Sequence, residues 1–474
     1  MAKKKKFKRI LGRTDILVLA FGAMIGWGWV VQSGEWILGA GTFGAMIAFA
    51  LGGIMIYFIA LTYAELTSAM PQNGGEHVFS KRALGNKASF ICTWAIIFGY
   101  ITVVMFEAVA LPTILEFLFP NFSRGFMYTI AGYDVNFTWV LVGVLGSVVV
   151  TIINYLGIKV AANLQTVLVV LLASVGIALA SKSALSGDIS NIQPTLTDGF
   201  GGILKILVLT PFFFVGFDVI PQAAGEINIP FKKVGRVMLA SIFFAVAWNV
   251  IIIWAVSYAM SSTQIAQANL TTAEAMKIVF GNSQVAANIL IIGGLAGIVS
   301  SWNSFLMAGS RAIQAMADSK MLPSFFAKVD KKHNTPANAI FFIGLISSLA
   351  PFLGKEALLW IANAGGLSVV FAYFIVSLSF LALRKNEPNM VRKYKVKNGK
   401  LVGIIAVIMS GIVFSLYLIP SLPSFLGFQE WLIVGSWIIL GVGMYVHCEV
   451  WKLDKKKFAK VQNRKAYAVK EGLV

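Results

Sequence analysis

Long apolar stretches alternate with short polar segments along almost the whole chain. A helix that spans a membrane needs about 20 mainly apolar residues, and within lipid it satisfies its own backbone hydrogen bonds. We therefore predict an all-α integral membrane protein with twelve transmembrane helices. The predicted spans lie at residues 15–39, 43–69, 88–118, 138–157, 160–181, 201–222, 234–260, 285–318, 337–353, 356–384, 401–421 and 427–450.

Composition supports a lipid environment for this chain. Of its 474 residues, 58% are hydrophobic and 12% are charged, about half the charged fraction of an ordinary soluble protein. Too few polar residues are present to cover a surface in water. We therefore expect membrane lipid to surround most of the molecule.

The positive charges are distributed unevenly between the two predicted sides. The formal net charge is +19, which in a soluble protein would suggest binding to nucleic acid. Here 34 of the 39 lysines and arginines fall on one side if the N-terminus is cytoplasmic. Positive residues stay on the cytoplasmic side of membrane proteins. We predict a multi-pass protein of the cell membrane, with both termini cytoplasmic and no nucleic-acid partner.

Residues that could support catalysis or metal binding are few and scattered. The two cysteines are Cys92 and Cys448, and the three histidines lie far apart at 77, 333 and 447. The chain also lacks the phosphate-binding pattern G-x-x-x-x-G-K-[ST]. These observations give little support to an enzyme, a transition-metal site, another cofactor or an ATP-driven pump. A channel is also less favoured, because a pore typically shows repeated polar rings.

Two predicted spans contain residues that interrupt helices. Segment 22–29 has three glycines, and segment 210–221 contains Gly216 and Asp218 between two prolines. Both residue types weaken or break a helix, and open backbone within a membrane is tolerated only where protein or a cavity satisfies it. Interrupted helices in corresponding halves of a transporter mark a binding site near the midplane. The free N–H and C=O groups at such breaks suit the two charges of a zwitterion.

Several motifs occur in the order that is typical of one transporter family. They are GAMIGWGW in the first span, ELTSAMPQNGGEHVFSKRALG after the second, FVGFDVIPQAAGEINIP in and after the sixth, SRAIQAMADSKMLPSFFAKVDKKHNTPANAI between the eighth and ninth, and LRKNEPNMVRKYKV after the tenth. The chain therefore resembles the amino acid–polyamine–organocation transporters. Trp27 stands where that family usually has a small residue, and Gly225 replaces an acid.

The resemblance implies a five-plus-five inverted-repeat (LeuT-like) core with broken helices one and six. It divides the chain into a basic cytoplasmic N-terminus (1–14), a first repeat of helices 1–5 (15–181), a second repeat of helices 6–10 (201–384), helices 11 and 12 (401–450) and a basic cytoplasmic tail (451–474). Members of the family occur as monomers and as homodimers.

The resemblance also implies a set of substrate-binding residues. The substrate carboxylate is expected at the backbone of Gly26, Trp27 and Gly28, and its amino group at carbonyls of Met24, Phe212 and Val215. Phe217 or the Phe212 ring would cover the substrate side chain. An inward-pointing Trp27 indole would restrict the site to small or medium substrates.

Two acids and a group of oxygen-bearing residues are candidates for coupling to an ion. Asp218 could bind a proton or clamp the backbone, and Glu107 could line the pathway or be a buried protonated group. The candidate sodium site comprises Gly22, Ile25, Gly297, Ser300 and Ser301. The alternative is that the two serines only hydrogen-bond to their own helix. Sodium-independent relatives carry a lysine in span five, and counting places the matching position near Leu172.

We predict a secondary active transporter that moves amino acids by alternating access, with ion-coupled uptake as the expected mode. Sodium and protons both remain open as the coupling ion. The alternatives are a transporter of polyamines or cationic amino acids, suggested by the two deep acids, and an amino acid exchanger.

Overall fold

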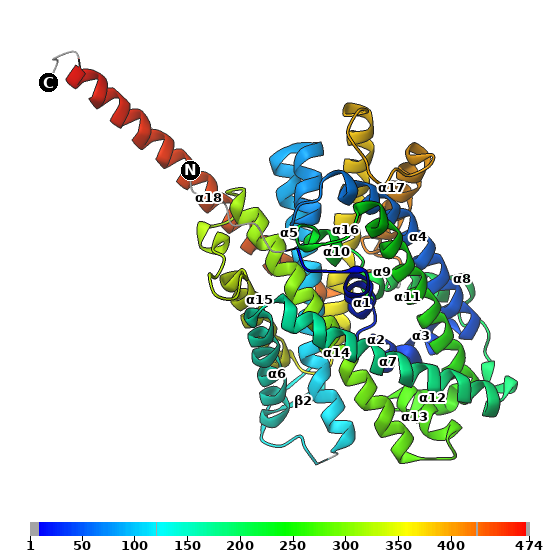
Figure 1. The fold of residues 1–474 in the computed structure, drawn as a ribbon. Coiled ribbons are helices and arrows are strands. Elements are labelled where there is room, and N and C mark those ends of the chain that lie inside the picture. Colours follow the sequence, from blue (N-terminus) through cyan, green and yellow to red (C-terminus); the bar gives the residue numbers. More distant parts are fainter. Residues whose placement is uncertain (1–8, 120, 423–424, 471–474) are drawn as a thin grey trace.

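The computed structural model describes residues 9–119, 121–422 and 425–470, except for the side chains of 158–163 and 451–470. Much of the predicted N-terminal segment and the side chains of the predicted tail therefore lie outside the described residues. The described chain is mainly helical (Figure 1). Its helices are α1 (Arg13–Met24), α2 (Gly28–Val31), α3 (Ser33–Ala40), α4 (Thr42–Ala69), α5 (Gly75–Leu118), α6 (Phe137–Leu156), α7 (Ile158–Ser186), α8 (Gly199–Leu207), α9 (Thr210–Phe214), α10 (Val219–Gln222), α11 (Phe231–Ala259), α12 (Ser262–Gln267), α13 (Thr271–Val279), α14 (Gln284–Asp318), α15 (Ala337–Leu349), α16 (Ala357–Asn386), α17 (Gly399–Leu416) and α18 (Phe428–Lys470).

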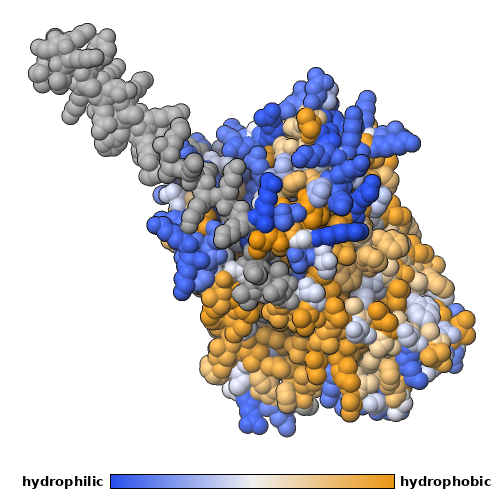
Figure 2. Space-filling model, viewed as in Figure 1, coloured by the Kyte–Doolittle hydropathy of each residue, from blue (hydrophilic) through white to orange (hydrophobic). Residues whose placement is uncertain are grey.

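Within the described residues, ten helices are long and apolar enough to cross a membrane. The predicted sixth span is not among them because it is divided into α8, α9 and α10. The predicted ninth span is a shorter apolar helix, Ala337–Leu353, in which α15 continues as a 3₁₀ turn. Hydrophobic residues form a broad belt on the face shown in Figure 2, with hydrophilic residues gathered beyond its ends. The chain is therefore a multi-pass membrane protein.

Three features differ from the sequence-based expectation. Helix α5 consists of two helices joined at a kink at Gly85, where φ is +84°; the second agrees with the predicted span 88–118, and the first, which begins at Gly75, was not predicted. The loop predicted at 261–284 contains α12 and α13. A hairpin of β1 (Phe126–Ile130) and β2 (Tyr133–Asn136) adds a small antiparallel sheet to the fold that we predicted as all-α.

Two long helices form the centre of the molecule. In the most apolar part of α5, 89% of the residues are buried inside the protein, and in α14 the share is 67%, against 22% for α18. Helix α5 packs on both α14 and α16, and α14 also packs on α1 and α7. The two central helices are therefore surrounded by protein, and they pack against parts of the broken first and sixth spans.

Candidate functional site

The first and sixth spans lose helical geometry at the segments where their sequences predict it. Helix α1 ends at Met24, and Ile25 has φ −106° and ψ +73° before α2 begins at Gly28. In the sixth span, α9 ends at Phe214 and α10 begins at Val219. The residues between these helices leave backbone groups outside regular hydrogen bonding, at two places in the protein interior.

The two breaks are packed directly against each other. Gly216 has φ +138°, and a Cβ at this position would lie 2.8 Å from both the backbone nitrogen of Met24 and the Cβ of Ala23. At a second contact, a Cβ on Gly28 would collide with the ring of Phe213. Glycine is required at 216 by both its backbone angle and the close approach. The crossing of the spans therefore depends on small residues in both.

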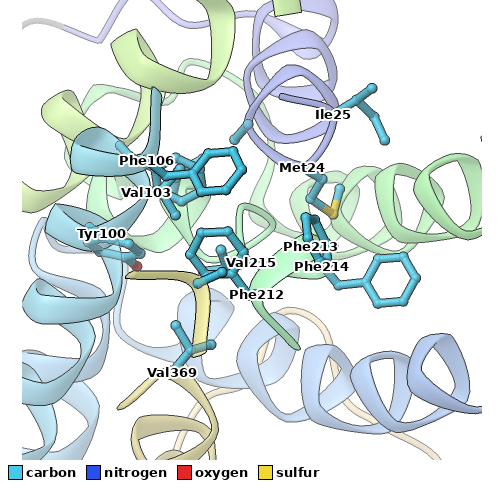
Figure 3. Packing of buried hydrophobic residues seen from close by; sticks show 14 of the residues in the cluster. Met24, Ile25, Tyr100, Val103, Phe106, Phe212, Phe213, Phe214, Val215 and Val369 are labelled. Carbon is cyan, nitrogen blue, oxygen red and sulfur yellow. The ribbon is translucent and has the colours of Figure 1, made fainter. Parts of the chain in front are cut away.

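A cavity of about 20 Å³ lies at this crossing, which is room for about one water molecule. The Phe106 and Phe212 rings face each other across it, with centroids 5.5 Å apart (Figure 3). An amino acid can enter only if side chains move apart, so the structure represents a closed state. The cavity is lined by Ala23, Met24, Ile25, Gly26, Trp27, Gly28, Trp29, Val103, Phe106, Glu107, Phe212, Phe213, Asn249, Ser301 and Phe305.

Glu107 is the acid of this cavity. It reaches the first break from α5: its Oε1 contacts the position that a Cβ on Gly26 would occupy. The Ser301 hydroxyl lies on the same side of the break, since that Cβ would be 3.0 Å from the Ser301 Oγ. Its Oε2 is buried and has no hydrogen-bond partner among the described residues. One carboxyl oxygen thus remains available at the wall of the cavity.

Asp218 lies beside the second break but does not line the cavity. Its Oδ1 accepts a hydrogen bond from the backbone N–H of Gly216 (2.8 Å). Its Oδ2 accepts from the hydroxyls of Tyr100 (3.0 Å) and Tyr373 (3.2 Å). The Tyr100 hydroxyl also lies 3.5 Å from Glu76, a second buried acid. These contacts hold the beginning of α10 to α5 and α16.

The residues proposed for sodium lie where α1, α7 and α14 meet, and two of them, Ile25 and Ser301, line the cavity. Ser300 donates a hydrogen bond to the Gly22 carbonyl (3.0 Å). Gln165 of α7 donates from Nε2 to the hydroxyls of Ser300 (2.7 Å) and Ser304 (3.1 Å). A side-chain amide therefore directs its positive end at one of the proposed ligands, the Ser300 hydroxyl.

Two residues of span five lie against the residues proposed for sodium. Leu172, the position obtained by counting, is buried against Gly297, where a Cβ would lie 2.6 Å from its Cδ1. Gln165, seven residues or about two helical turns earlier, reaches Gly22 and Ser300 on the same helix face.

Three aromatic residues can now be placed. The Trp27 indole packs against Gly294 of α14, and this contact joins the first span to α14. Phe217 packs on Tyr63 and Tyr373, at centroid distances of 5.3 and 5.4 Å. Neither Phe217 nor Val215 lines the cavity, whereas Phe212 does. Of the two aromatic lids that we considered, the structure places Phe212 at the site.

The sequence analysis missed Gln165 and Glu76. Gln165 is the one glutamine of the predicted span 160–181, and a polar amide in a mainly apolar span was the signal that could have identified it. Glu76 precedes the predicted third span, so it was interpreted as part of a loop. In the structure it is fully buried within α5, and Gln222 of α10 donates a hydrogen bond to it.

Many helices pack around two broken membrane spans, which cross at a central cavity. This arrangement defines the class of the protein as a membrane transporter. The comparisons identify the family: the amino acid permease family model matches residues 15–457, and the chain belongs to this family. It is a permease rather than an enzyme.

Relatives of known name match the chain over nearly its full length. The branched-chain amino acid permease BcaP of Bacillus subtilis is 29% identical, covering 91% of this chain and 92% of its own. The methylthioribose transporter of the same organism is 26% identical, with shares of 92% and 93%. The histidine permease HisP of Lactococcus lactis is 24% identical, with shares of 87% and 88%.

Proposed function

We propose that this protein is a proton-coupled symporter that takes up neutral amino acids with apolar side chains. The observation that carries the proposal is the cavity at the crossing of the two breaks, which combines open backbone, one acid and apolar walls. Membership of the amino acid permease family supports an amino acid as the transported substrate. The inverted-repeat core, alternating access and twelve spans are parts of the same proposal.

The amino acid would bind in the orientation that the sequence predicts. Its carboxylate would lie at the backbone of 26–28, and its ammonium at carbonyls near the ends of α1 and α9. Its side chain would enter the space between Val103, Phe106 and Phe212 once these groups separate. Burial of an apolar side chain there contributes about 25 cal/mol for each Å² removed from water.

Glu107 would link substrate binding to a proton. Its Oε1 lies against the backbone of Gly26, which is part of the predicted carboxylate site. Two carboxylates this close repel each other unless one carries a proton. The substrate therefore binds with a proton on Glu107, and release of the amino acid toward the cytoplasm accompanies release of that proton.

Two observations favour this assignment over the alternatives. The Gln165 amide donates to Ser300, and its partial positive charge opposes a sodium ion at that position. Of the two deep acids that suggested polyamines or cationic amino acids, Glu107 lines the cavity and Asp218 does not. The name of the branched-chain relative agrees with an apolar substrate.

The orientation in the membrane is also part of the proposal. The basic linker between α16 and α17 would be cytoplasmic, and α12 and α13 external. In a variant without its two native cysteines, cysteine at exposed Asn269 should react with an impermeant thiol reagent added to intact cells, and cysteine at exposed Lys397 should not. Reaction at both positions would contradict the topology.

Uptake by purified protein in proteoliposomes tests the function. A panel of labelled amino acids is offered under an imposed proton gradient, an imposed sodium gradient or neither. We expect leucine, isoleucine or valine to accumulate under the proton gradient alone. Accumulation driven only by sodium, or preferential uptake of lysine or putrescine, would refute the proposal.

A further inference from the structure

A basic cleft lies away from the central cavity, where α4, α11 and α17 meet the linker that follows α16. Its volume is about 440 Å³. Helix α4 packs against both α11 and α17, so the cleft is bounded by three membrane helices (Figure 1). The basic residues that line it are Lys232, Arg236, Lys393, Lys395 and Lys397, together with the less polar Leu61, Tyr394, Val396 and Val402.

The cleft contains positive charge that the protein itself does not neutralise. Among the described residues, none of the five cations forms an ion pair within 4 Å with an acid. The nearby buried acid, Glu65, is already bound by Arg384 (2.5 Å) and Arg392 (2.9 Å). Glu387 is held by Arg82, whose hydrogen bond lowers the pKa of that carboxyl. Like charges gathered in a partly enclosed cleft repel one another unless an anion binds between them.

Apolar surface continues from the cleft into the hydrophobic belt. On α4, Leu61 of the cleft shares a helix face with Tyr57 and Ile54, which are 44% and 49% exposed. On α17, the cleft residue is Val402, whereas Leu401 and Ile404 lie on another face of the helix and line a neighbouring pocket. A ligand that follows this surface has an anionic end in the cleft and apolar chains along α4.

We propose that this cleft binds the phosphodiester headgroup of an anionic phospholipid, with the acyl chains lying along α4. Basic residues near a membrane surface attract anionic lipid. The bound lipid would connect α4, α11 and the linker. Asn249, farther along α11, lines the central cavity, but none of the residues that line the cleft does. The proposal is therefore independent of the transported substrate.

The experiment measures the thermal unfolding midpoint of the purified full-length protein in detergent. Phosphatidylglycerol, phosphatidylcholine or inorganic phosphate is added separately. In the cleft variant, Lys232→Gln, Arg236→Gln and Lys395→Gln are combined. The matched control combines Lys328→Gln, Lys331→Gln and Lys332→Gln, which remove the same charge from the loop after α14. A charge-keeping variant combines K232R, R236K and K395R.

We expect phosphatidylglycerol to raise the midpoint by several degrees in the parent, the loop control and the charge-keeping variant, and to lose this effect in the cleft variant. Phosphatidylcholine should give no comparable rise. An equal rise in the cleft variant would overturn the proposal, because the effect would then follow overall charge. A full rise with inorganic phosphate alone would also overturn it, by assigning the cleft to a free anion. Loss of folding in both the cleft variant and the charge-keeping variant, while the loop control folds, would show that these cations serve structure rather than lipid binding.

Discussion

Glu107 and Asp218 are both almost fully buried acids beside a broken helix, yet their surroundings differ. Both oxygens of Asp218 are engaged, by one backbone N–H and two tyrosine hydroxyls. Glu107 lines the cavity, and its Oε2 has no partner among the described residues. Burial alone therefore does not distinguish an acid that holds the structure from an acid that can exchange a proton. The two acids are distinguished by whether one carboxyl oxygen lacks a hydrogen-bond partner.

The largest effect is expected from closing the space between Glu107 and the first break. Gly26→Ala should abolish amino acid binding and uptake, because its Cβ would occupy the position of Glu107 Oε1 and lie 3.0 Å from Ser301. Gly201→Ala is the control, since a Cβ there meets nothing within 4 Å. Binding is measured by substrate-dependent thermal stabilisation. Unchanged affinity of the Gly26 variant for the amino acid would show that the cavity is not the binding site.

The next effect separates the proton from the substrate. Glu107→Gln should reduce accumulation driven by a proton gradient by about tenfold or more, the equivalent of ~1.4 kcal/mol or more in the barrier. Exchange of labelled for unlabelled amino acid should continue, because glutamine is a neutral analogue of the protonated acid. Glu35→Gln at an exposed position serves as the control. Undiminished accumulation of the amino acid by the Glu107 variant would show that another residue couples transport to the proton.

Asp218→Asn should act mainly on stability. An asparagine side chain replaces one acceptor oxygen with a donor group, and loss of a buried hydrogen bond with its partner left unsatisfied costs about 1–3 kcal/mol. We expect a lower thermal midpoint, with substrate-linked proton uptake preserved. Tyr373→Phe, which removes one of the two hydroxyl donors, should give a smaller decrease. An Asp218 variant with parental stability but no coupling would reverse the comparison between the two acids.

The smallest effect concerns sodium. Replacing sodium by choline should change the uptake rate of the parent by less than about twofold, below ~0.4 kcal/mol, because Gln165 already donates to Ser300. Gln165→Glu supplies a carboxylate at the same position and should introduce a dependence on sodium. If uptake by the parent required sodium, the Gln165 amide would have to move away from Ser300 when the ion binds.

The sequence predicted the breaks better than it predicted which side chains face them. Glycine and proline weaken helices locally, so segments 22–29 and 210–221 could be identified without tertiary contacts. The direction of a side chain depends on packing against helices that are distant in the chain. This is why Phe217 and Phe212 could not be separated beforehand, although Phe212 alone of the two lines the cavity.

Partners across the fold were also beyond prediction. Gln165 hydrogen-bonds to Ser300, which lies 135 positions away in the sequence, and Gln222 hydrogen-bonds to Glu76, which lies 146 positions away. Hydrophobic periodicity gives the face of a helix, but it does not give the level at which two helices meet. The same limit explains why Gln165 of α7 was missed.

The most direct measurement is the number of protons taken up when an apolar amino acid binds. Calorimetric titration of the purified protein at alkaline pH, where Glu107 is ionised before the amino acid binds, in buffers that differ in ionisation enthalpy, reports this number separately from the heat of binding. We predict uptake of about one proton for each amino acid bound by the parent and by the Asp218→Asn variant, and close to none by Glu107→Gln. Binding without proton uptake in the parent, or unchanged uptake in the Glu107 variant, would contradict the assignment of Glu107 as the residue that couples the proton to the substrate.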